Sequence, residues 1–241
     1  MPIRPQPTVT VLPAEILART VVVALPAGTP TADLLAAANR RVAAAGLASL
    51  GGVPYFLARP GRSRHLLDRW HGLTTGAAVA RLDLAGMRQR SAFAATMQWR
   101  WWRYVTASTP TARSWTELRD RSEQDPEKYP LHRAQRDFAG QPRIVAMQAH
   151  NALPRQQWPL PPSELELFQA GELTYSTVAW LSAVPADGLA CPDGPLLQPH
   201  SRRLADRITY LRLANAHLDR LGPDAALVAV VVTGPYLPLD D

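Results

Sequence analysis

The sequence predicts a mixed α/β (α+β) protein with a small, mainly antiparallel sheet built from strands at the N- and C-terminal ends of the chain. Two apolar, β-branched runs have the composition of buried strands, Arg19–Leu25 and Ala225–Val232. Apolar residues at helical spacing lie beside both runs, and helical patterns fill most of the sequence between them. We therefore expect an arrangement of the ferredoxin-like kind that carries a large helical insertion.

The N-terminal part predicts the order strand, strand, helix, strand. Thr8–Leu12 alternates weakly between apolar and polar residues, and Arg19–Leu25 follows it as a buried strand. Gly46 is a good stop for the next helix, whose apolar stripe is predicted to be Leu34, Leu35, Ala38, Val42 and Ala45. Val53–Leu57 is the predicted returning strand, and its proline, Pro54, favours the sheet edge or a strand start.

The middle of the chain is predicted to be mainly helical. Leu84–Val105 has the pattern of one long helix. Two pairs have the spacing of a capping box that opens a helix, Ser114 with Glu117 and Ser163 with Glu166. Two segments rich in proline predict an extended connector and a loop, Pro154–Pro162 and Ala186–Pro199.

The C-terminal part returns to the sheet. Ser201 is expected to cap a helix that runs to about Leu221, and Ala225–Val232 is the strongest strand in the chain. The predicted sheet domain comprises residues 1–62 and 200–241, and residues 63–199 form the helical insertion. The tail Thr233–Pro238, a predicted turn, resembles the end of gas-vesicle proteins of the F/L type. Because the likeness is confined to this tail, it implies nothing about the rest of the chain.

The composition indicates a globular protein without covalent cross-links. A chain of 241 residues buries a sizeable core, and its single cysteine, Cys191, forms no intramolecular disulfide. That cysteine usage suits a reducing compartment. The sequence shows no apolar run of membrane-spanning length and no signal-peptide pattern at its start. We therefore expect a cytoplasmic protein with no membrane partner.

Arginine dominates the positive charge. Of the 26 basic residues only Lys128 is a lysine, so 25 are arginine, and the formal net charge is +6. Arginine stays charged under ordinary burial, and its planar fork matches carboxylate, phosphate and aromatic faces. This excess favours a polyanionic partner if the arginines cluster, whereas a scattered distribution would serve only to keep the protein in solution.

The stretch Met97–Tyr104 combines three tryptophans with two arginines. On a helix, one face consists of Phe93, Met97, Trp101 and Tyr104. Trp99 and Trp102 point well away from Trp101, so one stripe cannot bury all the rings. Three interpretations stay open: a surface that stacks bases and holds phosphates, a helix buried on several sides, and a protein–protein hot spot.

Further arginines extend this candidate surface. Four lie around a Pro-Gly turn before the long helix, where they are candidates for phosphate contacts: Arg59, Arg62, Arg64 and Arg69. Arg88 and Arg90 begin the long helix and extend the surface if the two segments are adjacent. Another set opens the last helix, at the end where the helix dipole disfavours cations and where such charges sometimes mark a ligand: Arg202, Arg203 and Arg207.

Motifs of catalysis and of metal binding are absent from the sequence. Its glycines match neither the phosphate-binding loop nor the dinucleotide pattern, and its histidines and Cys191 lack the spacing of a zinc site. No nucleophile elbow occurs, and nothing near Cys191 indicates a lowered pKa. We therefore predict no cofactor, no metal and no catalytic residue.

The leading hypothesis is a non-catalytic nucleic-acid-binding protein, as a subunit of a nucleoprotein complex. The predicted phosphate contacts are Arg59, Arg62, Arg64, Arg69, Arg88, Arg100 and Arg103, and the predicted stacking residues are Trp99, Trp102 and Tyr104. A second hypothesis is an interaction subunit that uses the Trp-rich helix as a protein hot spot. A third is an enzyme that acts on a small anionic metabolite in a cleft between sheet and helices, where a carboxylate or histidine meets arginine.

Overall fold

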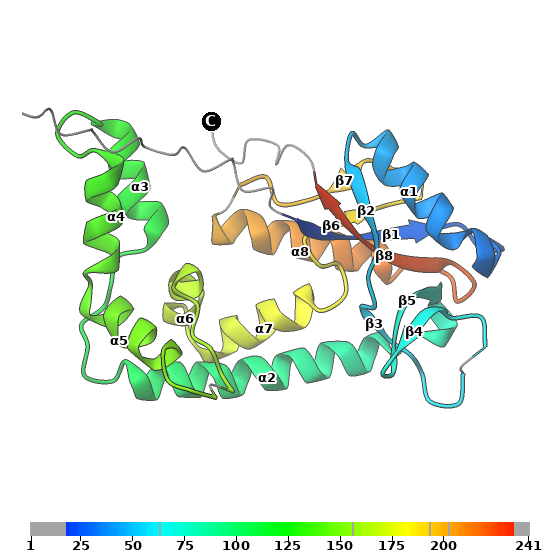
Figure 1. The fold of residues 1–241 in the computed structure, drawn as a ribbon, viewed down its shortest axis with the longest axis horizontal. Coiled ribbons are helices and arrows are strands. Elements are labelled where there is room, and N and C mark those ends of the chain that lie inside the picture. Colours follow the sequence, from blue (N-terminus) through cyan, green and yellow to red (C-terminus); the bar gives the residue numbers. More distant parts are fainter. Residues whose placement is uncertain (1–17, 63, 156, 193, 202, 234–241) are drawn as a thin grey trace, which may run out of the picture.

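A single mixed sheet forms one half of the protein. The computed structural model describes residues 18–233 except residues 63, 156, 193 and 202 (Figure 1). Its eight-stranded sheet is mostly antiparallel and includes strands from both ends of the chain, as predicted. The strands are β1 (Arg19–Leu25), β2 (Ala48–Gly52), β3 (Phe56–Leu57), β4 (Leu67–Trp70), β5 (Leu73–Ala78), β6 (Gly188–Ala190), β7 (Leu196–Leu197) and β8 (Ala226–Thr233).

β8 lies at the centre of this sheet. Along one edge it pairs antiparallel with β1 over the whole length of that strand, from Arg19 opposite Val232 to Leu25 opposite Ala226. Its other edge is shared, with β5 pairing near the start of β8 and β2 near its end. β1 then continues the sheet through β6, which forms the only parallel pair among the described residues.

Alternation along the central strands divides the core into two layers. Val21 and Val23 of β1 point to one face, where they pack with the buried side of α1 (Leu34–Ala44). Val22 points to the opposite face and joins the larger core, to which most of the other helices contribute. Successive side chains of a strand point to opposite faces, so a strand covered on both sides is apolar throughout. This explains why β1 and β8 are continuous apolar runs.

Among the described residues, seven further α-helices lie on the second face of the sheet or extend beyond its edge (Figure 1). They are α2 (Leu84–Val105), α3 (Trp115–Gln124), α4 (Leu131–Ala139), α5 (Pro142–Asn151), α6 (Leu165–Gln169), α7 (Glu172–Ser182) and α8 (Leu204–Leu218). Short 3-10 helices occupy Thr31–Asp33, Val79–Arg81 and Pro162–Glu164. α7 packs against both α2 and α8, so it links the sheet layer to the long helix (Figure 1). Among the described residues, no helix combines the length and the apolar character needed to cross a bilayer.

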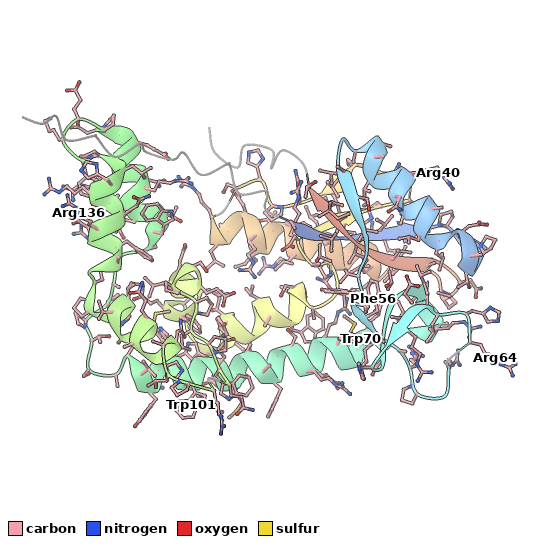
Figure 2. The ribbon with its side chains drawn as sticks, viewed as in Figure 1. Arg40, Phe56, Arg64, Trp70, Trp101 and Arg136 are labelled. Atoms are coloured by element: carbon pink, nitrogen blue, oxygen red, sulfur yellow. The ribbon has the colours of Figure 1, made fainter. Side chains whose placement is uncertain are left out.

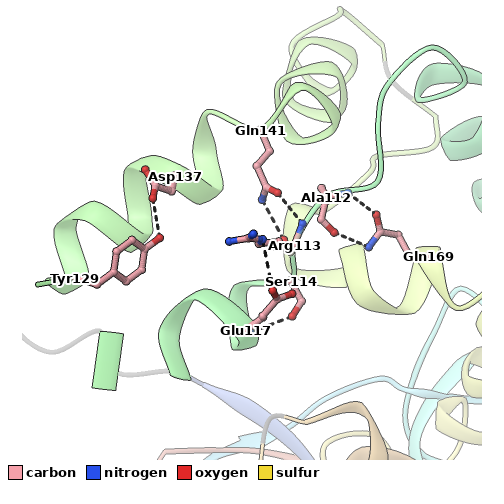
Figure 3. A network of polar contacts seen from close by, with 8 residues as sticks. All are labelled: Ala112, Arg113, Ser114, Glu117, Tyr129, Asp137, Gln141 and Gln169. Atoms are coloured by element: carbon pink, nitrogen blue, oxygen red, sulfur yellow. Dashed lines mark hydrogen bonds and ion pairs between the residues drawn. The ribbon is translucent and has the colours of Figure 1, made fainter. Parts of the chain in front are cut away.

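Two glutamines fix the extended segment that leads into α3 (Figure 3). The amide of Gln141 accepts from the backbone N–H of Arg113 at 2.6 Å and donates to its carbonyl at 3.0 Å. Gln169 makes the same two-way pairing with Ala112, at 3.0 and 2.9 Å. Each side-chain amide thus satisfies both backbone groups of an extended residue, as a neighbouring strand would. Ser114 then accepts from the N–H of Glu117, which confirms the first predicted cap.

Several local predictions need correction. The pair Ser163 and Glu166 makes no cap, because the 3-10 helix Pro162–Glu164 leads directly into α6. The segment Ala186–Pro199 contains β6 and β7 instead of being a loop throughout. Within Val53–Leu57 only Phe56–Leu57 is a strand. The predicted features at Thr8–Leu12 and at residues 234–238 lie outside the described residues.

Candidate functional site

The outer face of α2 is aromatic and turned to solvent. We define this face as Phe93, Met97, Arg100, Trp101 and Tyr104. The exposed fractions of its rings are 68% for Phe93, 41% for Trp101 and 76% for Tyr104. Four of the five residues, all except Phe93, line a shallow hollow of about 430 Å³. Trp101 and Tyr104 meet edge to face, with centroids 5.9 Å apart, so the patch has a defined shape.

The inner face of α2 carries the other two tryptophans. Trp99 and Trp102 are only 9% and 6% exposed. The Trp102 ring stacks on Phe168 at a centroid distance of 5.4 Å, and Phe168 stacks on Tyr175 at 4.5 Å. Trp99 donates its indole N–H to the carbonyl of Phe168 at 2.9 Å. Through Phe168, both indoles pack α2 against α6.

This placement corrects the expected aromatic surface. We expected Trp99 and Trp102 to stack bases beside Tyr104, but both are buried, so of the three only Tyr104 offers a ring to a ligand. The exposed rings are instead those of the stripe that begins at Phe93. Helical geometry separated the two sets correctly, but it did not indicate which set faces the core.

The arginines before α2 are partly engaged with nearby backbone. Arg59 donates to the carbonyl of Leu82 at 2.9 Å, and Arg62 donates to the carbonyl of Ala80 at 3.3 Å. Both contacts tie the Pro-Gly turn to the residues that precede α2. Arg64 and Arg69 are exposed, and no hydrogen bond or ion pair of their guanidinium groups occurs among the described residues.

The arginines of α2 also have neighbours within the fold. Arg88 donates to Asn215 at 2.6 Å, lies 3.3 Å from a carboxylate oxygen of Asp219 and packs over the ring of Trp180. Arg100 pairs with Glu172 at 3.3 Å, although the Arg100 side chain stays 63% exposed. Arg103 lies over the Trp99 ring with its Cζ 5.6 Å from the centroid. Of these, Arg100 and Arg103 remain accessible to a partner.

The two predicted basic clusters lie at opposite ends of α2. Figure 2 shows Arg64 in the loop beside the sheet and Trp101 near the far end of the helix. α2 has 22 residues, which is roughly 33 Å at 1.5 Å per residue. The structure therefore brings Arg100, Arg103 and Tyr104 together, but it separates them from Arg59, Arg62, Arg64 and Arg69.

A site that the sequence hardly indicated lies between the sheet and α8. A cavity of about 520 Å³ is lined by the tyrosines Tyr55 and Tyr210, by Asp187 and by Arg207, among others. Burial, with the negative charge of Asp187 adding to it, raises the pKa of both tyrosine hydroxyls above the usual value. Both are therefore neutral at physiological pH. The only signal in the sequence was the position of Arg207 at the dipole-disfavoured end of its helix.

Among the described residues, no cluster of three or more histidine, cysteine or carboxylate side chains has the arrangement of a metal site. Cys191 is buried, and burial raises the pKa of its thiol, which is the opposite of what a nucleophile needs. Comparisons with protein-family models, with curated proteins and with solved structures found no match for this chain.

Proposed function

We propose that this protein is an interaction subunit that docks an acidic amphipathic helix of a partner protein on the outer face of α2. The observation that carries the proposal is the exposure of Phe93, Trp101 and Tyr104 on one side of a single rigid helix. Large contiguous apolar surfaces on a folded protein mark interaction sites. Tryptophan, tyrosine, methionine and arginine are also the residues enriched at protein interfaces.

The charge of α2 defines the chemistry of the partner. The helix contains four arginines and no aspartate or glutamate. Arg90, Arg100 and Arg103 are exposed beside or within the aromatic row. A partner helix with apolar residues at spacings of three and four would cover the rings, and glutamates along its flanks would meet the guanidinium groups. A basic amphipathic helix would place like charges together and be rejected.

Nucleic-acid binding is the competing proposal. The net charge of +6 and the accessible Arg64, Arg69, Arg100 and Arg103 favour it. The burial of Trp99 and Trp102 removes two of its three stacking rings, and the basic clusters are far apart. We therefore rank the protein partner first. The predicted ferredoxin-like relationship of the sheet likewise stays a proposal, which the adjacent pairing of β1 with β8 supports.

A labelled helical peptide tests the proposal directly. The probe is a designed peptide with leucines on one face and glutamates on both flanks, and its binding is measured by fluorescence anisotropy. We expect saturable binding, and we expect Tyr104→Ala and Phe93→Ala each to weaken it by about tenfold or more, as for interface hot spots. Trp70→Ala is the matched control, because Trp70 is 63% exposed but lies on β4, near the opposite end of α2 from Trp101 (Figure 2).

Two further probes distinguish a protein partner from nucleic acid. A peptide with lysines in place of the glutamates should bind at least tenfold more weakly. A labelled single-stranded oligonucleotide should show no saturable binding at physiological salt. Oligonucleotide binding that falls steeply with salt and is lost in Arg100→Gln would assign the face to nucleic acid instead. Peptide binding that is unchanged in Tyr104→Ala and Phe93→Ala would overturn the proposed face.

A further inference from the structure

Two cavities meet at the side chain of Arg207. The first is the cavity of about 520 Å³ between the sheet and α8, and the second, of about 480 Å³, lies among α2, α7 and the segment that leads into α6. Arg207 and Ser182 line both. Cavities of this size suit small metabolites. The first cavity lies between the sheet and the helices, and Arg207 and the carboxylate of Asp187 both line it.

The guanidinium of Arg207 has no partner within the described protein. Its side chain is half-buried, yet no hydrogen bond or ion pair of this group occurs among the described residues. Its charge is close enough to Tyr175 to oppose the rise in that hydroxyl's pKa. An arginine in a partly desolvated position normally meets a carboxylate or phosphate, because its donors are costly to leave unmatched. The guanidinium of Arg207 is therefore available to bind an anionic group of a ligand.

The tyrosine hydroxyls of the first cavity already donate their protons to backbone carbonyls. The hydroxyl of Tyr55 donates to the carbonyl of Ala183 at 2.9 Å, and the hydroxyl of Tyr210 donates to the carbonyl of Pro185 at 2.9 Å. Both phenolic oxygens can still accept a hydrogen bond. The carboxylate of Asp187 accepts from the backbone N–H of Thr20 through Oδ2, which leaves Oδ1 without a protein donor among the described residues.

The cavity thus presents one cationic donor and several acceptors. A simple anion would satisfy Arg207 but would lie beside the negative charge of Asp187. A simple cation would satisfy Asp187 but leave Arg207 unmatched. A molecule that carries both charges meets every group at once. The ammonium end fits Asp187 better than Glu164 in the second cavity, because Tyr55 and Tyr210 add two acceptor oxygens beside Asp187.

We infer that this cavity binds a small zwitterion, with a carboxylate of the ligand on Arg207 and an ammonium group on Asp187. The inference is independent of the proposed function, because the outer face of α2 contributes no residue to this cavity. The ligand class is that of amino acids and their longer ω-amino homologues. The protein would then have a small-molecule site on the sheet side of α7 and a partner site on the exposed side of α2.

A series of probes with matched halves tests this inference. The probes are the straight-chain ω-amino acids from glycine to 6-aminohexanoate, together with the carboxylic acid and the amine of equal length for each. Binding to the full chain is measured by isothermal titration calorimetry at constant ionic strength. We expect at least one ω-amino acid to bind, and we expect it to bind about tenfold or more tightly than either matched half. If no member of the series binds, the inference is refuted.

Variants then locate the binding. Arg207→Met should weaken binding of the best probe by about ten- to a hundredfold, and Asp187→Asn should weaken it similarly while still accepting from Thr20. Arg212→Met is the matched control, because Arg212 is an exposed residue of the same helix and lies outside both cavities. Arg207→Lys keeps the charge and should bind with intermediate affinity, which guards against loss of folding. Equal affinity in Arg207→Met and wild type would place the ligand elsewhere, and equal affinity for the carboxylic acid alone would overturn the zwitterion class.

Discussion

The guanidinium of Arg143 lies over the Trp102 ring, with its Cζ 5.4 Å from the ring centroid. It closes one end of the aromatic stack that continues through Phe168 to Tyr175. Arg143 also donates to the hydroxyl and to the carbonyl of Thr109, at 3.1 and 2.8 Å, and to the side chain of Gln169 at 2.8 Å. One planar cation thus joins the end of α2 to α5 and α6.

The first prediction concerns the hydrogen bonds that the Arg143 guanidinium donates. Arg143→Lys keeps the positive charge but cannot make the same set of hydrogen bonds or stack on the indole, so we expect a loss of about 1–3 kcal/mol in the free energy of unfolding. Urea denaturation followed by circular dichroism measures it. Arg136→Lys is the control, since Arg136 is exposed and makes no side-chain contact of this kind among the described residues. Equal stability of the two variants would contradict a structural role for Arg143.

The second prediction concerns a close approach in the sheet. Gly76 of β5 pairs with Val228 of β8, and a Cβ at Gly76 would lie 2.6 Å from the carbonyl oxygen of Leu227. Gly76→Ala should therefore destabilise the protein by about 1–3 kcal/mol through overpacking. Gly222→Ala has open space around its Cβ and should change stability by less than about 0.5 kcal/mol. Thermal unfolding of the two variants, compared at equal protein concentration, decides the matter.

The third prediction concerns the start of α2. Asp83 accepts from the backbone N–H of Gly86 at 3.0 Å and so caps the longest helix of the described chain. Asp83→Ala should cost about 0.5–2 kcal/mol of stability, whereas Asp83→Ser should recover most of that loss because a hydroxyl also accepts from the first turn. The midpoints of chemical unfolding provide the comparison. A serine variant no more stable than the alanine variant would show that the cap contributes little.

The fourth prediction concerns alkaline pH. Burial raises the pKa of Tyr55 and Tyr210 in the folded state, so the folded protein keeps these protons while the unfolded chain releases them near pH 10. The stability that depends on them is complete below about pH 9 and is lost as the pH rises above about 10. With Lys128 as the only lysine, tyrosines dominate the titration in this range, and Tyr175, whose pKa burial also raises, adds to the same loss of stability. Urea midpoints measured from pH 8 to pH 11 should fall.

Two tyrosine variants test whether the buried hydroxyls cause this fall in the urea midpoint. Tyr210→Phe removes a buried hydroxyl and should make the urea midpoint less dependent on pH, even though it loses the hydrogen bond to Pro185. Tyr104→Phe alters an exposed hydroxyl and should leave the pH dependence as in wild type. A wild-type midpoint that stays constant up to pH 11 would disagree with the burial of these side chains.

Elements with a strong local pattern could be predicted from the sequence. Arg19–Leu25 and Leu84–Val105 have the predicted bounds, because a continuous β-branched run and a long segment without proline leave few alternatives. β4 and β5 were not predicted, since Leu67–Trp70 is largely exposed and polar and forms a strand only by pairing with its neighbour. β6 was hidden by the prolines and glycines around it, and it is a strand because it lies beside β1.

The functional surfaces were harder to predict. Spacing alone showed that Trp99 and Trp102 point away from Trp101, but the buried side depends on where α6 and α7 pack. Phe168, which stacks on Trp102, and Tyr175, which stacks on Phe168, follow Trp102 by more than sixty positions in the sequence. The cavity at Arg207 likewise draws Thr20, Tyr55 and Asp187 from separate segments of the chain. No local sequence pattern predicts that residues from such separate segments line one cavity.

The central position of β8 has a consequence for synthesis on the ribosome. β1 emerges long before residues 226–232, the antiparallel partner that covers its whole length. Until that segment is released, β1, β2 and β5 have exposed edges that invite pairing with other nascent chains. Residues 84–182, which contain the packed helices α2 and α7, are all synthesised before that segment, so the helical layer can form earlier. Truncation before residue 226 should therefore give an aggregation-prone product instead of a smaller folded domain.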